Sequence, residues 1–240
     1  MSYNNEIIGL LATVDAPFSS HMIKEILNSG IEVDFIIFDG KKMSEKDGRI
    51  WNERTQGKIP YISLAEFQDR AVPFYYFKSH NSPEVARFVR DKKTSLLINA
   101  GTPRILGQKV LSSPERGVLN IHPGELPYYR GCTVLEWAIY NDDRAGNTVH
   151  FMSEGIDEGP IVSSEIYEFS KSDTYADVRI KNYLNAFQLM SRSIKKVVDN
   201  NMTSKSLPPQ GEGNYYKVMP PELLEEVKKK LKLGQYKYQY

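Results

Sequence analysis

Cysteine is nearly absent from this sequence, which has one, Cys132, among 240 residues. A single cysteine excludes an internal disulfide and the clustered thiols of a zinc site. None of the four histidines has a spacing typical of metal ligands, so we expect no metal. No run approaches the ~20 apolar residues of a membrane span, and the start, MSYNNEIIGLLATVDAP, lacks the basic segment of a signal peptide. These absences predict a cytoplasmic protein without a membrane partner.

The sequence also lacks a strong excess of charge of either sign. Lys and Arg number 31 against 30 Asp and Glu, which leaves a net charge of +1. Without a basic field, we expect no nucleic-acid partner. No G-x-G-x-x-G follows the first apolar run, and no Walker sequence occurs, so the common nucleotide fingerprints are missing. The remaining composition, 40% hydrophobic and 25% charged, is ordinary for a globular protein.

What is present is an alternation of apolar runs and amphipathic segments. Short apolar runs predict buried strands at 7–14, 33–40, 95–101 and 117–122. Strand composition predicts further strands at 74–78, 147–152 and 160–169. Helical spacing predicts helices at 19–30, 82–93, 133–142 and from 173 to about 200. Residues 41–72 are polar and weakly periodic, which indicates a long loop with a short helix near 63–70.

This alternation predicts an α/β fold that is Rossmann-like, with a mostly parallel sheet and helices on both faces. Residues 1–201 would form the catalytic domain. The turn-rich stretch 202–214 begins a small carboxyl-terminal extension, 202–240, with a short strand and a helix with a basic end.

Two polar residues stand two apart at the end of the run GVLNIH. Asn120 and His122 point to the same side of a strand, and ligands in open parallel sheets bind beyond the carboxyl ends of strands. A histidine there can act as a base or an electrophile, and an asparagine can donate to a developing oxyanion. Asp157 is one candidate to orient the imidazole, because the strand 147–152 before it could pair with 117–122. The pattern alone also leaves open the following aspartates: Asp15, Asp39, Asp142 and Asp143.

Three motifs resemble the folate-dependent formyltransferases, and they occur in the same order as in that family. They are LLINAGTPRIL (96–106), NIHPGELPYYRG (120–131) and TVHFMSEGIDEGPI (148–161). The resemblance implies 10-formyltetrahydrofolate as the formyl donor and an amine as the acceptor. His122 would then be a base or a cation, Asp157 would hold its imidazole, and Asn120 would stabilise the oxyanion.

The same resemblance implies two segments that bind the folate. One is the pterin-facing segment Arg104, Ile105 and Leu106. The other is the loop that wraps the opposite side, formed by Met152, Ser153, Glu154, Gly155 and Ile156.

One departure from the family pattern concerns the acceptor side. The family usually has serine two residues after the histidine and an apolar residue next, whereas this chain has Gly124 and Glu125.

His150 lies among apolar neighbours, and we interpret it as a structural residue. His21 and His80 receive no predicted role.

The acceptor predicted from the resemblance is an amino sugar linked to a nucleoside diphosphate. The insertion at 38–58 and the carboxyl-terminal tail are similar to those of sugar N-formyltransferases, which are commonly homodimers. A dTDP-4-amino-4,6-dideoxy sugar, used for surface polysaccharide such as the O-antigen of lipopolysaccharide, is the expected substrate. Aromatic and basic side chains suit such a ligand, and the candidates are Lys78, Tyr128, Tyr129, Arg130, Trp51 and Tyr215.

Three alternatives remain open at this stage. They are a glycinamide ribonucleotide formyltransferase, a hydrolase of 10-formyltetrahydrofolate and a non-catalytic binding protein. A methionyl-tRNA formyltransferase is the remaining member of the family to consider. The near-zero net charge and the modest length after the last motif are expected to disfavour the tRNA enzyme.

Overall fold

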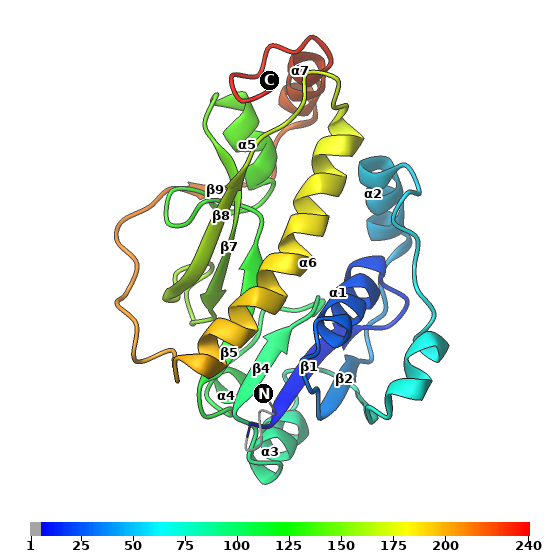
Figure 1. Ribbon diagram of the computed structural model, residues 1–240, viewed down its shortest axis with the longest axis vertical. Coiled ribbons are helices and arrows are strands. Elements are labelled where there is room, and N and C mark those ends of the chain that lie inside the picture. Colours follow the sequence, from blue (N-terminus) through cyan, green and yellow to red (C-terminus); the bar gives the residue numbers. More distant parts are fainter. Residues whose placement is uncertain (1–5) are drawn as a thin grey trace.

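A single seven-stranded sheet forms the centre of the protein. The computed structural model describes residues 6–240, so the first five residues of the predicted catalytic domain lie outside the described residues. The strand order is β3-β2-β1-β4-β5-β7-β8 (Figure 1). The strands are β1 (Ile8–Thr13), β2 (Phe35–Asp39), β3 (Phe74–Phe77), β4 (Leu96–Asn99), β5 (Gly117–His122), β7 (Ala145–Phe151) and β8 (Ile161–Tyr167).

Strands β1 to β5 pair in parallel, whereas β7 runs antiparallel to both β5 and β8. Because β2 and β4 flank β1 on opposite sides, the strand order reverses there, and ligands bind beyond the strand ends at such a point. The predicted strands are all present, and the expected pairing of 117–122 with 147–152 is confirmed by the register Asn120 to His150.

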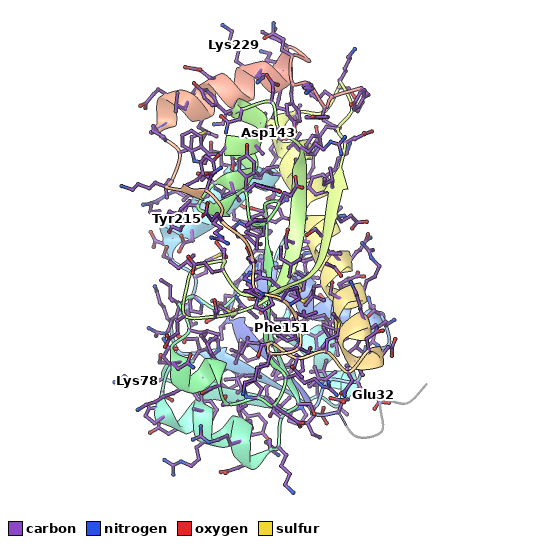
Figure 2. All side chains as sticks on the ribbon, turned by 90° about the vertical axis from the view of Figure 1, so that its left-hand side faces the viewer. Glu32, Lys78, Asp143, Phe151, Tyr215 and Lys229 are labelled. Atoms are coloured by element: carbon purple, nitrogen blue, oxygen red, sulfur yellow. The ribbon has the colours of Figure 1, made fainter. Side chains whose placement is uncertain are left out.

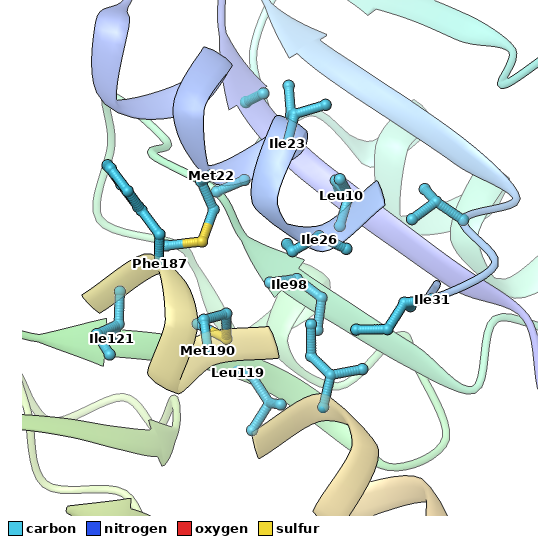
Figure 3. Packing of buried hydrophobic residues seen from close by; sticks show 14 of the residues in the cluster. Leu10, Met22, Ile23, Ile26, Ile31, Ile98, Leu119, Ile121, Phe187 and Met190 are labelled. Carbon is cyan, nitrogen blue, oxygen red and sulfur yellow. The ribbon is translucent and has the colours of Figure 1, made fainter. Parts of the chain in front are cut away.

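Helices cover both faces of the sheet, as the alternation predicts. On one face lie α1 (Pro17–Asn28), α2 (Glu45–Thr55) and the long α6 (Tyr175–Asp199), which crosses the sheet diagonally (Figure 1). Side chains of α1 and α6, among them Met22, Ile26 and Met190, pack on the strand residues Leu10 and Ile98 (Figure 3). On the other face lie α3 (Pro83–Asp91) and the short α4 (Gln108–Leu111), whose apolar residues join a second core cluster.

The region 41–72 differs from the predicted long loop. The helix α2 occupies part of it, and only the short 3-10 helix at Leu64–Arg70 was expected. Ser44 caps α2 by accepting from the backbone N–H of Asp47. Of its eleven residues only Trp51 and Thr55 are buried, so the sequence shows no broad apolar face that would reveal the helix.

Trp51 is also a correction to the predicted acceptor contacts. Its ring packs 4.6 Å from the ring of Tyr183 on α6, and its indole N–H donates to the backbone oxygen of Ile59 at 2.9 Å. Both the apolar surface and the polar atom of Trp51 are thus used within the fold. Trp51 fastens α2 to the core and does not face a substrate site.

The carboxyl-terminal extension packs onto the upper end of the catalytic domain in Figure 1. Its strand β9 (Tyr215–Tyr216) pairs with β6 (Arg130–Gly131), and its helix α7 (Pro221–Lys232) packs against α5 (Val134–Tyr140). Val227 and Leu231 of α7 share a buried cluster with Leu135 and Ile139 of α5. In the described residues, no helix has the length and apolar character needed to cross a membrane.

Candidate active site

Asn120 and His122 end β5 beside the reversal of strand order. The neighbouring strand β4 ends at Asn99. The side-chain amide of Asn99 donates to the side-chain oxygen Oδ1 of Asn120 at 2.8 Å. The amide nitrogen of Asn120 lies 3.1 Å from Nε2 of His150, which is its partner in the sheet register. The Asn120 amide is therefore held at both ends, with its nitrogen directed by His150.

His150 belongs to this site, although its sequence surroundings indicate a purely structural residue. Burial lowers the pKa of His150 to about 4, against the opposing charge of Asp157, so the ring is neutral near pH 7. Its Nδ1 faces the backbone oxygen of Phe151 at 2.9 Å and must carry the proton, which leaves Nε2 to accept from Asn120. A second hydrogen of the Asn120 amide remains free for a ligand.

His122 and Asp157 form a buried ion-pair contact. Nδ1 of His122 lies 3.3 Å from a carboxylate oxygen of Asp157, and Nε2 lies 2.6 Å from the backbone oxygen of Tyr129. Both ring nitrogens face acceptors, and only the imidazolium form donates to both. Gly124 permits this arrangement, because a Cβ there would lie 2.7 Å from the Tyr129 oxygen and 3.1 Å from Nε2 of His122.

Asp157 reaches His122 from the loop after β7. Its backbone is left-handed, with φ of 57°, a conformation that aspartate tolerates better than most residues. Burial acts to raise the pKa of Asp157, but pairing with His122 and the backbone N–H of Gly131 outweigh it, and the pKa lies below its ordinary value. Asp157 is therefore a carboxylate at neutral pH.

One pocket joins these groups to the segments expected to bind the folate. Asn99, Asn120, His150 and Asp157 line it on one side. All eight residues of those segments line the rest, namely Arg104, Ile105, Leu106, Met152, Ser153, Glu154, Gly155 and Ile156. Ile105 is 72% exposed at the rim, whereas Leu106 also packs into the second core cluster.

A buried polar network holds the segment around Arg104. The guanidinium of Arg104 binds both carboxylate oxygens of Asp39, at 2.7 and 2.9 Å, and Asp39 has no exposed side-chain surface. The backbone N–H of His80 donates to the same carboxylate, and the His80 ring contacts the Thr102 hydroxyl at 2.6 Å. His80, which received no predicted role, thus connects the end of β2 to the rim of the pocket.

The predicted acceptor residues do not all lie together. Tyr129 is buried, with its ring stacked on Tyr216 and its hydroxyl donating to Asp143 at 2.5 Å, so it meets His122 through its backbone oxygen. A second pocket lies beside this loop and is lined by Glu125, Tyr128, Tyr129, Asp143, Arg144, Asn214, Tyr216 and Tyr238.

Arg130 and Tyr215 pair within β6 and β9, and Tyr215 is exposed. Lys78 follows the edge strand β3, and its backbone oxygen lies 3.5 Å from the guanidinium of Arg104, so it lies toward the expected folate segments; its contact with the acceptor stays a prediction. Figure 2 shows Lys78 in the lower half of the molecule and Tyr215 in the upper half.

With this geometry in place, comparison with known proteins is decisive on one point. A family model described as Formyl transferase matches residues 10–193 of the chain. The chain belongs to the formyl transferase family. The matched range includes Asn120, His122, His150 and Asp157, and it ends within α6, before the carboxyl-terminal extension.

The relatives of this chain differ in the acceptors that their names give. A methionyl-tRNA formyltransferase of Thermotoga maritima is 25% identical over 189 residues, 78% of this chain and 58% of the relative. The fold is similar to that of glycinamide ribonucleotide transformylase 1 from Symbiobacterium toebii, with TM-score 0.62, 20% identity, and coverage of 92% of this chain and 96% of that one. It is also similar to a sugar N-formyltransferase from Shewanella sp, with TM-score 0.61, 16% identity and coverage of 98% and 92%.

The two structural matches show the shared fold alone, because their sequence identity is low. This chain spans about half the length of the curated relatives it matches. Among the side chains that the structure describes, no group of three or more His, Cys, Asp or Glu could hold a metal ion.

Proposed function

We propose that this protein transfers the formyl group of 10-formyltetrahydrofolate to the amine of an amino sugar linked to a nucleoside diphosphate. The observation that carries the proposal is the single pocket that joins the expected folate segments to Asn120 and Asp157, with His122 behind Asp157. A dTDP-4-amino-4,6-dideoxy sugar for surface polysaccharide is the acceptor we propose. A cytoplasmic homodimer remains a prediction.

The chemistry assigned to this site balances as an acyl transfer. The neutral amine attacks the formyl carbon, a C–N bond forms, and the formyl oxygen becomes an oxyanion. The free amide hydrogen of Asn120 faces the pocket and donates to that oxyanion. When this tetrahedral intermediate collapses, the bond between the formyl carbon and N10 of the folate breaks, and N10 takes up a proton. The amide product and tetrahydrofolate result.

The His122–Asp157 pair handles the proton in this scheme. Asp157 is ionised and lines the pocket, so it faces the proton that the attacking amine loses. The neighbouring imidazolium of His122 supplies a positive charge that stabilises the oxyanion, and its Nδ1 proton reaches the leaving nitrogen by way of Asp157, which lines the pocket. Nε2 of His122 is covered by the Tyr129 backbone oxygen, so proton exchange runs through the Nδ1 side, toward Asp157.

The second pocket supports a nucleotide-linked acceptor. Tyr128 is 56% exposed at its rim, and the guanidinium of Arg144 lies 5.7 Å from the ring centre of Tyr238. Exposed aromatic rings can stack on a base, and arginine can pair with a pyrophosphate. Tyr129 connects the two regions, because its ring lines the second pocket while its backbone oxygen contacts His122.

Methionyl-tRNA is the second candidate acceptor. Curated relatives carry that name, including one from Thermotoga neapolitana that is 33% identical over 159 residues. The match covers only 48% of that relative, and the net charge of +1 offers little attraction to a polyanion. We therefore place the tRNA second.

A panel of acceptors tests the proposal. The protein is incubated with 10-formyltetrahydrofolate and, separately, dTDP-amino sugars, UDP-amino sugars, glycinamide ribonucleotide, charged methionyl-tRNA or no acceptor, and formylated products are identified by mass spectrometry. We expect a formylated sugar nucleotide and little folate turnover without acceptor. Formyl-methionyl-tRNA or formylglycinamide ribonucleotide as the sole product would replace the sugar acceptor. Rapid turnover without acceptor would indicate a hydrolase, and no turnover a binding protein.

Arg104→Ala is expected to raise KM for the folate about 10-fold while changing kcat much less. The substitution leaves the buried Asp39 carboxylate without its partner and loosens the rim of the pocket. Loss of one charged hydrogen-bond partner at the rim of a site corresponds to about a 10-fold change in an equilibrium constant. Initial rates with the folate varied measure the effect, with Arg90→Ala on the exposed side of α3 as the control. A fall in kcat at constant KM would contradict this role.

A further inference from the structure

Gln210 lies in the segment that connects α6 to β9 and contacts the Asp157 loop directly. This segment swings outward after α6 and returns across the molecule to β9 (Figure 1). The amide nitrogen of Gln210 donates to the backbone oxygens of Asp157, at 3.0 Å, and Gly159, at 2.5 Å. Its side-chain oxygen accepts from the guanidinium of Arg130 at 3.1 Å.

The chemistry of this contact requires an amide. Glutamine offers two N–H donors and one carbonyl acceptor, and all three meet a partner here. Arg130 fixes which end of the amide is the oxygen, because a guanidinium has donors only. Glutamate would place a charged acceptor against two carbonyl oxygens. Alanine would remove all three bonds without introducing a charge.

The segment around Gln210 is itself firmly seated on the acceptor-side loop. The backbone N–H of Arg130 donates to Asn214 O at 2.9 Å, and the N–H of Cys132 donates to Tyr216 O at 2.9 Å. A Cβ at position 213 would overlap the backbone oxygen of Pro127. Only glycine at this position lets the two segments approach so closely.

Asp157 is consequently held from two sides. The backbone N–H of Gly131, in β6, donates to its carboxylate at 3.0 Å, and Gln210 binds its backbone oxygen. Both β6 and Gln210 depend on the returning segment, because β9 pairs with β6. The backbone of Asp157 is left-handed, and these contacts help to hold that conformation.

We infer that Gln210 is a positioning residue for the formyl transfer site, which aligns Asp157 with His122 and ties the Asp157 loop to Arg130. The inference rests on the proposed roles of His122 and Asp157, but not on the identity of the acceptor. Gln210 lies beyond the range 10–193 that matches the family. The carboxyl-terminal extension is thereby part of the active-site architecture.

Two variants and a matched control test this role. Gln210→Ala is expected to lower kcat about 10-fold, and Gln210→Glu about 100-fold, because small displacements of a catalytic group reduce rates strongly. Glu212→Ala, an exposed change two residues away, is expected to leave kcat unchanged. Melting temperatures of all three variants show whether the fold is retained.

A double-mutant cycle separates positioning from general structural support. If Gln210 acts through Asp157, Gln210→Ala should cost little further activity in an Asp157→Asn background. The full 10-fold loss in that background would overturn the inference, as would a Gln210→Ala variant equal to Glu212→Ala. The cycle is run with whichever amine of the acceptor panel is formylated.

A second readout is independent of turnover and therefore of the proposed function. The Asp157 carboxyl is titrated by NMR in wild type and in Gln210→Ala. Looser contact with His122 and Gly131 should raise the pKa of Asp157 from its lowered value. An unchanged titration would overturn the inference even if no acceptor were found, whereas a raised pKa without any turnover would support Gln210 and reject the proposed function.

Discussion

His122→Gln is expected to lower kcat for formyl transfer by on the order of 1,000-fold while changing folate affinity by about three-fold or less. Glutamine retains an amide donor that can reach the Tyr129 oxygen or Asp157, but it carries no positive charge and transfers no proton. The folate should still bind, because His122 lies behind Asp157 and does not line the pocket with Arg104 and Ile105.

Two measurements on His122→Gln separate chemistry from binding. Single-turnover rates at saturating folate report the chemical step, and the dissociation constant of 10-formyltetrahydrofolate is measured without acceptor. His21→Gln makes the same chemical change on α1, where the ring contacts the Pro60 oxygen and does not line the pocket. A rate for His122→Gln within ten-fold of that control would remove His122 from the catalytic scheme.

The arrangement of the sheet could be predicted because its signals are local. Parallel strands covered on both faces are apolar throughout, and β1, β2 and β4 appear as such runs in the sequence. Asn120 and His122 could be placed on the same side of the strand end because side chains alternate with a period of two residues. The pairing of adjacent strands made Asp157 one candidate to approach His122, and the resemblance to the formyltransferases selected it over the other aspartates.

Features that depend on long-range packing escaped sequence analysis. Helix α2 has a polar surface, and its position is set by Trp51 against Tyr183 of α6. His150 has apolar neighbours in sequence, and only the register opposite Asn120 reveals its role. A polar residue directly across from a suspected catalytic residue on a neighbouring strand is the signal that could have identified it.

Gln210 had no local signal at all. It lies in a turn-rich stretch, 51 residues from Gly159, and its contacts exist only because β9 pairs with β6. The division into a catalytic domain, 1–201, and an extension, 202–240, stays a prediction, and the contacts of Gln210 with the Asp157 loop cross it.

Asp157→Asn is expected to reduce kcat by on the order of 100- to 1,000-fold, because the buried imidazolium of His122 loses its counter-charge. Asparagine is isosteric and can still accept from the N–H of Gly131, so the loop should keep its course. Steady-state kinetics at saturating folate and acceptor measure the loss. A variant that retains half of the wild-type kcat would show that the carboxylate charge is dispensable.

The stability of Asp157→Asn should depend on pH in a defined direction. The pKa of Asp157 is lowered in the folded protein, so its carboxylate contributes stability at neutral pH that is lost as pH falls below the ordinary value of about 4. We therefore expect the variant to be less stable than wild type by about 1–3 kcal/mol at pH 7, with the difference shrinking toward pH 3. Urea unfolding at a series of pH values measures it, and Asp91→Asn, an exposed carboxyl at the end of α3, is the control. A difference that grew on acidification would mean that Asp157 is strained in its ionised form, and that the pair with His122 does not stabilise the fold.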